Sequence, residues 1–270
     1  MTNRPSWAPD DIDIERPAPA RMYDFYLGGS HNFAADRALA SQALEVWPDS
    51  PHIARANRGF LRRAVGFAVS RGIDQFLDLG SGIPTSGNVH EIAHSLDPTA
   101  RIVYVDNDPV AVAHSRNLLA GNERAAVVHA DMRDTETVLA EARRRLDFER
   151  PVAVLMFAVL HFVPDEDDPA AVVEAYHRAT VRDSLLAVSH ATNDFEPERL
   201  EEMEEVYRGA TAGLTGRGHK GILSLLGPYE IVPPGLVSMI DWRPDPEAGP
   251  DPLGGDVRRY SAYAVVGVHT

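Results

Sequence analysis

Five short apolar runs, separated by stretches with helical spacing, dominate the middle of the chain. The runs span residues 75–79, 102–105, 126–129, 152–157 and 184–189. Each is short and apolar enough for a strand that is buried on both faces. Strands that alternate with helices are typical of a parallel sheet with crossover helices, so we predict an α/β fold.

Helix signals lie between and before these runs. Asp108-Pro109 and Asp168-Pro169 each combine a capping carboxylate with a proline suited to the first helical position, so a helix is expected to begin at each. Upstream, the apolar spacing predicts a helix over residues 52–70. A shorter helix, capped by Asp36 and ending near residue 46, is expected to follow an aromatic turn around residues 23–27.

The pattern loosens after residue 189. A Glu-rich helix is expected over residues 197–212, in a region rich in glycine and proline that we interpret as a cover. Two further apolar runs, 236–240 and 260–268, are separated by a Pro-rich link that is too short for a crossover helix. They predict an antiparallel hairpin at the edge of a sheet with seven strands in all.

Composition and charge narrow the function classes. The 270-residue chain contains no cysteine, which excludes disulfides, zinc-thiolate sites and a thiol nucleophile. Its formal net charge of −14 disfavours binding to nucleic acid, because Lys and Arg drive that association. No apolar run approaches the length of a membrane span, and the N-terminus lacks the apolar core of a signal peptide. We therefore expect a cytoplasmic protein without a membrane partner; the oligomeric state stays open.

A glycine turn follows the first predicted strand, in the segment FLDLGSGIPTSGN. Gly80 and Gly82 let the backbone turn sharply and approach a ligand closely. A dinucleotide site would need a third glycine where Thr85 stands, so this spacing disfavours NAD. Asp78 would repel a pyrophosphate, whereas it suits an ammonium group or water bound to one.

Two more acids follow the next two predicted strands. Asp106 lies where an acid that binds ribose hydroxyls is expected, although Asp108 competes for that role; the proline after Asp108 favours it as the helix cap. Asp131 can accept from an adenine amino group, with Met132 packed on the ring. Ligands of open α/β sheets bind beyond the carboxyl ends of the strands, where these acids are expected to meet.

These motifs resemble those of class I S-adenosylmethionine-dependent methyltransferases. The shared motifs, in chain order, are DLGSG, VYVDND, HADMRD and VLMFAVLHFVPD. A narrower resemblance, to an actinobacterial family of S-adenosyl methyltransferases that was first a domain of unknown function, depends on RMYDFYLGGSHNFAADR, GSGIPTSGNVHEIA and PPGLVSMIDWRPD. It covers residues 17–268. The chain departs from the broad pattern at Pro84, where a third glycine is common, which leaves the loop path beyond Gly82 open.

The resemblance implies a Rossmann-like class I fold, with a seven-stranded mixed sheet and an N-terminal helical extension. We divide the chain into a flexible arm (1–20) and one methyltransferase domain (21–270). Within that domain we expect a helical extension (21–72), a cofactor-binding core (73–190), a helical cover (191–234) and a C-terminal hairpin (235–270).

The resemblance also assigns the cofactor's parts. Asp78, Gly80 and Gly82 would line the methionine part of S-adenosylmethionine, Asp106 the ribose, and Asp131 with Met132 the adenine. The full expected cofactor site comprises Tyr23, Asp24, Gly28, Gly29, Asn32, Asp78, Gly80, Ser81, Gly82, Asp106, Asn107, Asp131, Met132 and Phe157. The N-terminal members of this set could fold over the methionine end of the cofactor. Alternatively, the aromatic residues Tyr23, Phe25, Tyr26 and Phe33 are merely a hydrophobic staple for the first helix.

Two histidines are candidates for a general base, which only an acceptor that must lose a proton requires. His161 follows the fourth predicted strand and His190 the fifth, where a substrate should arrive. Alternatively, either histidine caps a strand end or bonds to backbone. No spaced metal motif is present in the sequence, so no metal is expected.

Three functional hypotheses remain. The first is a methyltransferase that acts on a small molecule and releases S-adenosylhomocysteine. The second is a catalytically silent protein that binds S-adenosylmethionine and regulates a partner. The third, an NAD-dependent reductase, is disfavoured by the glycine spacing.

Overall fold

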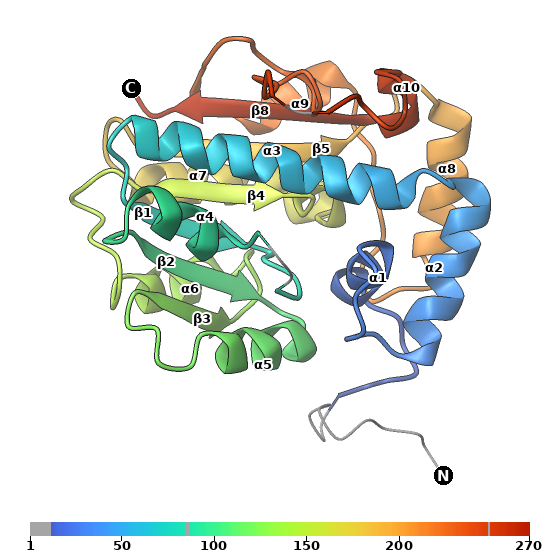
Figure 1. Cartoon of the computed structure of the whole chain (residues 1–270), viewed down its shortest axis with the longest axis horizontal. Helices are drawn as coiled ribbons and strands as arrows, with labels where there is room; N and C mark the ends of the chain where they lie inside the picture. The colour runs from blue at the N-terminus through green and yellow to red at the C-terminus, as the bar shows by residue number, and fades with distance from the viewer. Residues whose placement is uncertain (1–11, 85–86, 248) are drawn as a thin grey trace.

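The computed structural model describes residues 12–84, 87–247 and 249–270. The first eleven residues of the predicted arm, together with Thr85, lie outside this range. One mixed sheet forms the centre of the molecule, in the order β3-β2-β1-β4-β5-β8-β6, and β7 also pairs with β8 (Figure 1). The α/β fold predicted from the sequence is confirmed.

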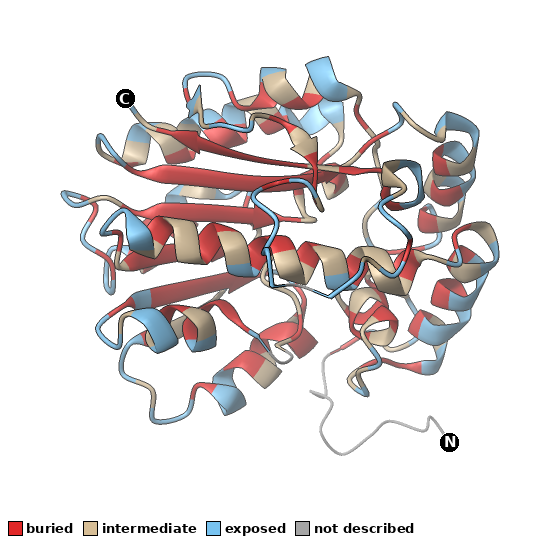
Figure 2. Ribbon diagram, turned by 45° about the horizontal axis from the view of Figure 1, so that its top comes forward, coloured by how far each residue is buried: buried red, intermediate tan, exposed pale blue. Residues whose placement is uncertain are grey.

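The five predicted parallel strands are confirmed to within two residues. Every pair formed among these five strands is parallel. They are β1 (Gln75–Leu79), β2 (Arg101–Asp106), β3 (Ala125–His129), β4 (Ala153–Phe157) and β5 (Leu185–Ala191). Nearly all of β1, β2, β4 and β5 is buried, which explains their unbroken apolar sequence (Figure 2).

The predicted C-terminal hairpin is confirmed as the antiparallel pair of β7 and β8, but the sheet around it differs from the prediction. The strand β8 (Ala262–Val268) is antiparallel to β5 on one side and pairs with both β6 (Glu230–Ile231) and β7 (Val237–Ser238) on the other. The sheet therefore has eight strands rather than seven, and β8 lies inside it rather than at its edge. Two-residue strands leave no periodic signal, and Pro233 and Pro234, which lack an N–H, separate them.

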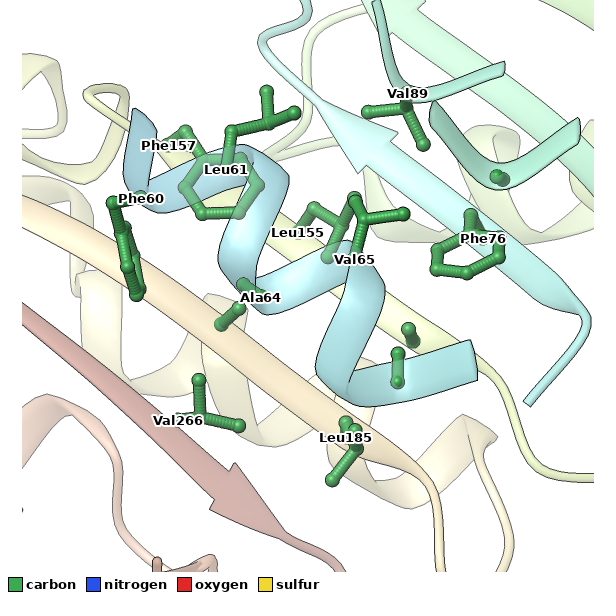
Figure 3. Close-up of a cluster of buried hydrophobic side chains, with 14 of the residues drawn as sticks. Phe60, Leu61, Ala64, Val65, Phe76, Val89, Leu155, Phe157, Leu185 and Val266 are labelled. Atoms are coloured by element: carbon green, nitrogen blue, oxygen red, sulfur yellow. The ribbon is translucent and has the colours of Figure 1, made fainter. Parts of the chain in front are cut away.

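Helices cover both faces of the sheet. On one face lie α3 (Ser50–Ser70) and α4 (Val89–Leu96), and Figure 3 shows the α3 side chains of Phe60, Leu61, Ala64 and Val65 directed at the sheet. On the other lie α6 (Thr135–Ala142), α7 (Pro169–Ala179) and α9 (His219–Leu225). The helix α5 (Pro109–Leu118) packs along β2 and β3. The predicted caps are confirmed: Asp108 and Asp168 accept backbone N–H groups of α5 and α7.

Helices from both ends of the chain lie beyond the tips of the parallel strands (Figure 1). They are α1 (Pro19–Tyr26), α2 (Ala34–Val46) and α8 (Pro197–Tyr207), which share a third apolar cluster. The short elements η1 (Leu160–Phe162), η2 (Asp165–Asp167) and α10 (Val257–Tyr260) lie in connecting segments.

Three expectations for the N-terminal part need correction. The aromatic segment is a helix, α1, because Pro19 at its first turn has the backbone torsion that a helix needs. Asp36 does cap α2, but from its first turn rather than from the position before the helix: its carboxylate accepts the N–H of Phe33 at 2.7 Å. Residues 12–18, assigned to a loose arm, include the buried Ile12 and Ala18.

Candidate functional site

A cavity of about 740 Å³ lies at the carboxyl ends of the parallel strands. Its floor includes residues that end β1, β2, β4 and β5, and its walls come from α1, α3, α8 and the segment after α8. Most of the expected cofactor residues line it: Tyr23, Asp78, Gly80, Ser81, Gly82, Asp106, Asn107, Asp131, Met132 and Phe157. Both candidate histidines line it as well.

The turn after β1 uses glycine for two different reasons. Gly80 and Gly82 have φ values of 67° and 66°, a region that residues with a Cβ rarely adopt. A Cβ on Gly80 would lie 2.2 Å from Cγ2 of Val159, whereas a Cβ on Gly82 would meet nothing within 4 Å. The N–H of Gly82 donates to Oδ2 of Asp106 at 2.7 Å. The turn is thereby fixed against the end of β2.

Replacing Gly80 by alanine is expected to lower the free energy of unfolding by about 2–4 kcal/mol, because strain and overpacking add. Gly82→Ala is the matched control, since it introduces the same backbone strain without the clash and should cost only about 1 kcal/mol. Urea unfolding followed by circular dichroism measures both. Equal losses in the two variants would contradict the contact with Val159.

Asp106 is buried and holds the two loops beside it. Its Oδ1 accepts the N–H of Asp108 at 2.8 Å, while Oδ2 accepts that of Gly82. Burial raises the pKa of Asp106 to about 6, against the lowering effect of these hydrogen bonds. Each carboxylate oxygen still has a second lone pair, so Asp106 can accept two hydroxyl groups as well. Asp108 instead caps α5, as the proline after it indicated.

Asp78 is the most perturbed acid of the cavity. It is 4% exposed, and burial raises its pKa to about 7. The positive charge of Arg58 lowers this pKa and the negative charge of Asp106 raises it. Burial disfavours the charged form of Asp78. A cation bound beside Asp78 would stabilise that charged form and lower its pKa again.

The loop after β3 forms the outer end of the cavity. Arg133 donates to both carboxylate oxygens of Asp131, with its Nε 2.9 Å from Oδ1, and this pairing lowers the pKa of Asp131. Asn107 also donates to Asp131. Met132 is buried, and its carbonyl accepts the hydroxyl of Tyr176 at 2.6 Å. This loop therefore places an acidic group beside an apolar side chain, and hydrogen bonds hold both residues.

Only Tyr23 of the expected N-terminal residues lines the cavity. Asp24, Gly28, Gly29 and Asn32 lie outside its described lining. Asp24 instead organises the turn after α1, where Oδ2 accepts the N–H of His31 at 2.9 Å and Nδ2 of Asn32 at 2.8 Å. A Cβ on Gly29 would overlap the Asp24 carboxylate. These residues form a structural turn that fixes α1 over the site.

His190 has both ring nitrogens engaged by the protein. Its Nε2 lies 3.0 Å from Nη1 of Arg217, and its Nδ1 lies 2.7 Å from the carbonyl oxygen of Ala191. Arginine can only donate, so Nε2 accepts and Nδ1 carries the proton. Burial lowers the pKa of His190 to about 4. Protein groups thus occupy both ring nitrogens, one of them the backbone carbonyl that the alternative interpretation expected, and this argues against His190 as a base.

His161 has one nitrogen engaged by the backbone. Its Nδ1 accepts the N–H of Ala191 at 3.2 Å, so the neutral ring carries its proton on Nε2. Burial, with lesser effects of His190 and Arg217, lowers the pKa of His161 well below its usual value. The ring therefore faces the cavity as a hydrogen-bond donor, not as a base.

Sequence reasoning missed three polar residues around the cavity. Arg58 acts on Asp78, and buried Arg217 ties the segment after α8 to η1 through the carbonyl of Leu160. Asn57 donates to the Tyr23 hydroxyl at 3.0 Å and accepts from Ser189 at 2.6 Å. Asn57 could have been found, because it interrupts the apolar stripe of a helix; the arginines carry no local signal.

Two absences hold for the part of the chain that the structure describes. No group of three or more metal-ligating side chains occurs there. In the same residues, every helix is too short or too polar to cross a bilayer.

The comparison with protein families is decisive. A family described as S-adenosyl methyltransferase matches residues 5–269. The chain belongs to this family. It is an S-adenosylmethionine-dependent methyltransferase with the class I fold, which agrees with the resemblance found in its motifs and favours methyl transfer over NAD-dependent reduction.

Two solved structures resemble this S-adenosyl methyltransferase over nearly its whole length. A protein of Thermobifida fusca YX, assigned as a methyltransferase, is 38% identical, with a TM-score of 0.89 over 98% of this chain and 99% of that one. A DUF574 family protein of Streptomyces avermitilis MA-4680 is 37% identical, with a TM-score of 0.90 over 96% and 99%.

More distant similarity shows the fold alone. The N-methyltransferase NodS from Bradyrhizobium japonicum WM9, in complex with S-adenosyl-l-homocysteine, is 12% identical, with a TM-score of 0.50 over 86% of this chain and 96% of that one. No curated protein matches the S-adenosyl methyltransferase described here.

Proposed function

We propose that the cavity binds S-adenosylmethionine across the ends of β1, β2 and β3 and transfers its methyl group to a small molecule over β4 and β5. Asp78 would pair with the ammonium of the methionine part, Asp106 would accept the ribose hydroxyls, and Asp131 with Met132 would hold the adenine. The family supports this cofactor.

One observation carries the proposal. A single cavity joins the Gly80 turn, the acid that ends β2 and the loop after β3, and it continues beyond them to Phe157 and His161. The three acidic positions therefore account for only part of the cavity. The remaining space over β4 and β5 can hold a second molecule beside the cofactor's methionine end.

The bound cofactor supplies an electrophilic methyl group on a sulfonium. The residues of this chain contribute orientation and exclusion of water, since the acceptor lone pair must lie in line with the methyl. Helices α1 and α8 close the cavity above the strands, with Tyr26 and Tyr207 in contact at 3.3 Å. Neither candidate histidine is available as a base, so the chemistry depends on an acceptor that already presents its lone pair.

Isothermal titration calorimetry with S-adenosylmethionine tests the cofactor site. Asp106→Asn should weaken binding by about ten- to a hundredfold, because hydrogen bonds from the ribose hydroxyls to a charged group are lost. The matched control is Asp134→Asn, the same change at a helix cap outside the described lining of the cavity. If the wild type does not bind, or both variants bind equally, the proposed function is wrong.

A further inference from the structure

The part of the cavity beyond the expected cofactor site has apolar and aromatic walls. We call it the acceptor chamber and define it by Tyr26, Trp47, Phe162, Leu200, Met203 and Tyr207, all of which line the cavity. These residues belong to one apolar cluster at the junction of α1, α2, η1 and α8. The rings of Phe162 and Tyr207 lie 5.8 Å apart and are inclined by 32°. A planar, largely apolar molecule fits such walls.

The chamber's polar side chains are already paired with protein groups. The hydroxyls of Tyr26 and Tyr207 bond to each other, and Trp47 Nε1 donates to the carbonyl of Arg259 at 2.9 Å. Burial raises the pKa of both tyrosines, that of Tyr207 to about 12. Neither hydroxyl therefore acts as a base near neutral pH, although one of the two retains a hydrogen that it can donate.

His161 is the polar group next to the chamber. Its ring lies 4.5 Å from that of Phe162, in an edge-to-face arrangement. Because Nδ1 is occupied by the N–H of Ala191, Nε2 carries the proton, and none of the hydrogen bonds among the described residues uses Nε2. Nε2 is thus a donor that is open to an acceptor atom of a bound molecule.

A buried arginine lies behind this corner. Arg217 donates to the carbonyl of Leu160 and to His190, and its Nε and Nη2 both donate to Asp165, whose side chain is 77% exposed. The ring of His190 lies 5.5 Å from that of His161. Among the described residues, the acids that line the cavity lie on none of the elements that form the chamber, α1, α2, η1 and α8; they are Asp13, Asp78, Asp106, Asp108, Asp131 and Asp167. A bound ammonium would find no counter-ion there.

We infer that the acceptor is a planar, largely apolar carboxylic acid, which is bound as its carboxylate and leaves as a methyl ester. This inference rests on the proposed function. One carboxylate oxygen accepts Nε2–H of His161, and the other retains the lone pair that attacks the methyl. The new O–CH₃ bond forms as the CH₃–S bond breaks, and the electron pair of the broken bond stays on sulfur. The products are a neutral ester and S-adenosylhomocysteine, and no proton has to be removed.

The test uses naphthalene, quinoline and biphenyl, each supplied as the carboxylic acid, the primary amide and the amine. Binding is measured by calorimetry with S-adenosylhomocysteine present, and methyl transfer from S-adenosylmethionine by mass spectrometry. We expect the acids to bind about ten- to a hundredfold more tightly than the matching amides. We also expect methyl esters as products.

Three variants test which residue causes the preference for acids and where the acids bind. In His161→Phe the preference for acid over amide should disappear, whereas His219→Phe, the same change at an exposed histidine outside the described lining, should keep it. In Met203→Trp the acids should lose binding while S-adenosylhomocysteine still binds. The inference is overturned if amides or amines bind as well as acids, if none binds, if only amines are methylated, or if His161→Phe keeps the acid preference. Failure of the proposed function is recognised separately, because S-adenosylhomocysteine itself would not bind.

Discussion

Replacing Arg21 by methionine is expected to lower the free energy of unfolding by about 3–5 kcal/mol, since it leaves buried charges without a partner. Arg21 is 3% exposed, and its Nε lies 3.0 Å from Asp36 while its Nη1 lies 3.1 Å from Asp108. Asp36 is fully buried and Asp108 nearly so. These ion pairs join α1, α2 and the start of α5, which follows the expected ribose-binding acid.

The matched control is Arg133→Met. Arg133 also bridges two acids, Asp131 and Asp167, but its side chain is 44% exposed. Its loss should cost no more than about 1 kcal/mol. Urea unfolding monitored by circular dichroism gives both values. We further expect Arg21→Met to weaken S-adenosylmethionine binding, because α1 lines the cavity; equal stability losses in the two variants would contradict the buried network.

Replacing Asp78 by asparagine is expected to stabilise the ligand-free protein and at the same time to weaken the binding of S-adenosylmethionine. The pKa of Asp78 rises from 3.8 to about 7 on folding. Between these values the folded protein holds a proton that the unfolded chain releases, so stability falls as the pH rises from about 4 to 7 and then levels off. Asp78→Asn removes this loss, which amounts to up to about 4 kcal/mol above pH 7.

The affinity for S-adenosylmethionine should change with pH in the opposite direction to the stability of the ligand-free protein. An ammonium beside Asp78 favours the ionised carboxyl, so affinity for S-adenosylmethionine should rise from pH 5 to 7 by up to about tenfold per unit. The Asp78→Asn variant should bind S-adenosylmethionine about ten- to a hundredfold more weakly near neutral pH. The pH dependence that remains should be shallower, because it would come from the ionisation of Asp106 alone. Thermal melts without ligand and calorimetry at several pH values measure the two effects. A variant that loses both stability and affinity would show that Asp78 supports the fold instead.

The lining of the site was predicted best where local sequence fixes the backbone. Asp78, Gly80, Gly82 and Asp106 end or follow strands whose apolar pattern is unambiguous, and parallel strands bring their carboxyl ends to one edge of the sheet. Asp24 and Asn32 show the limit of such reasoning. Their residue types suit a ligand equally well, yet hydrogen bonds within their own turn occupy them.

The sequence by itself determined the parallel strands, the helix caps at Asp108 and Asp168, and the glycine turn, because each depends on contacts between residues near in the chain or on a regular period. Only the tertiary structure decided which side chains meet at the site and how they are hydrogen-bonded. The proton on His161 is placed by the N–H of Ala191, thirty residues away, and Arg21 meets Asp108 across 87 residues. Such partners leave no periodic trace in the sequence, since their approach depends on the packing of the whole chain.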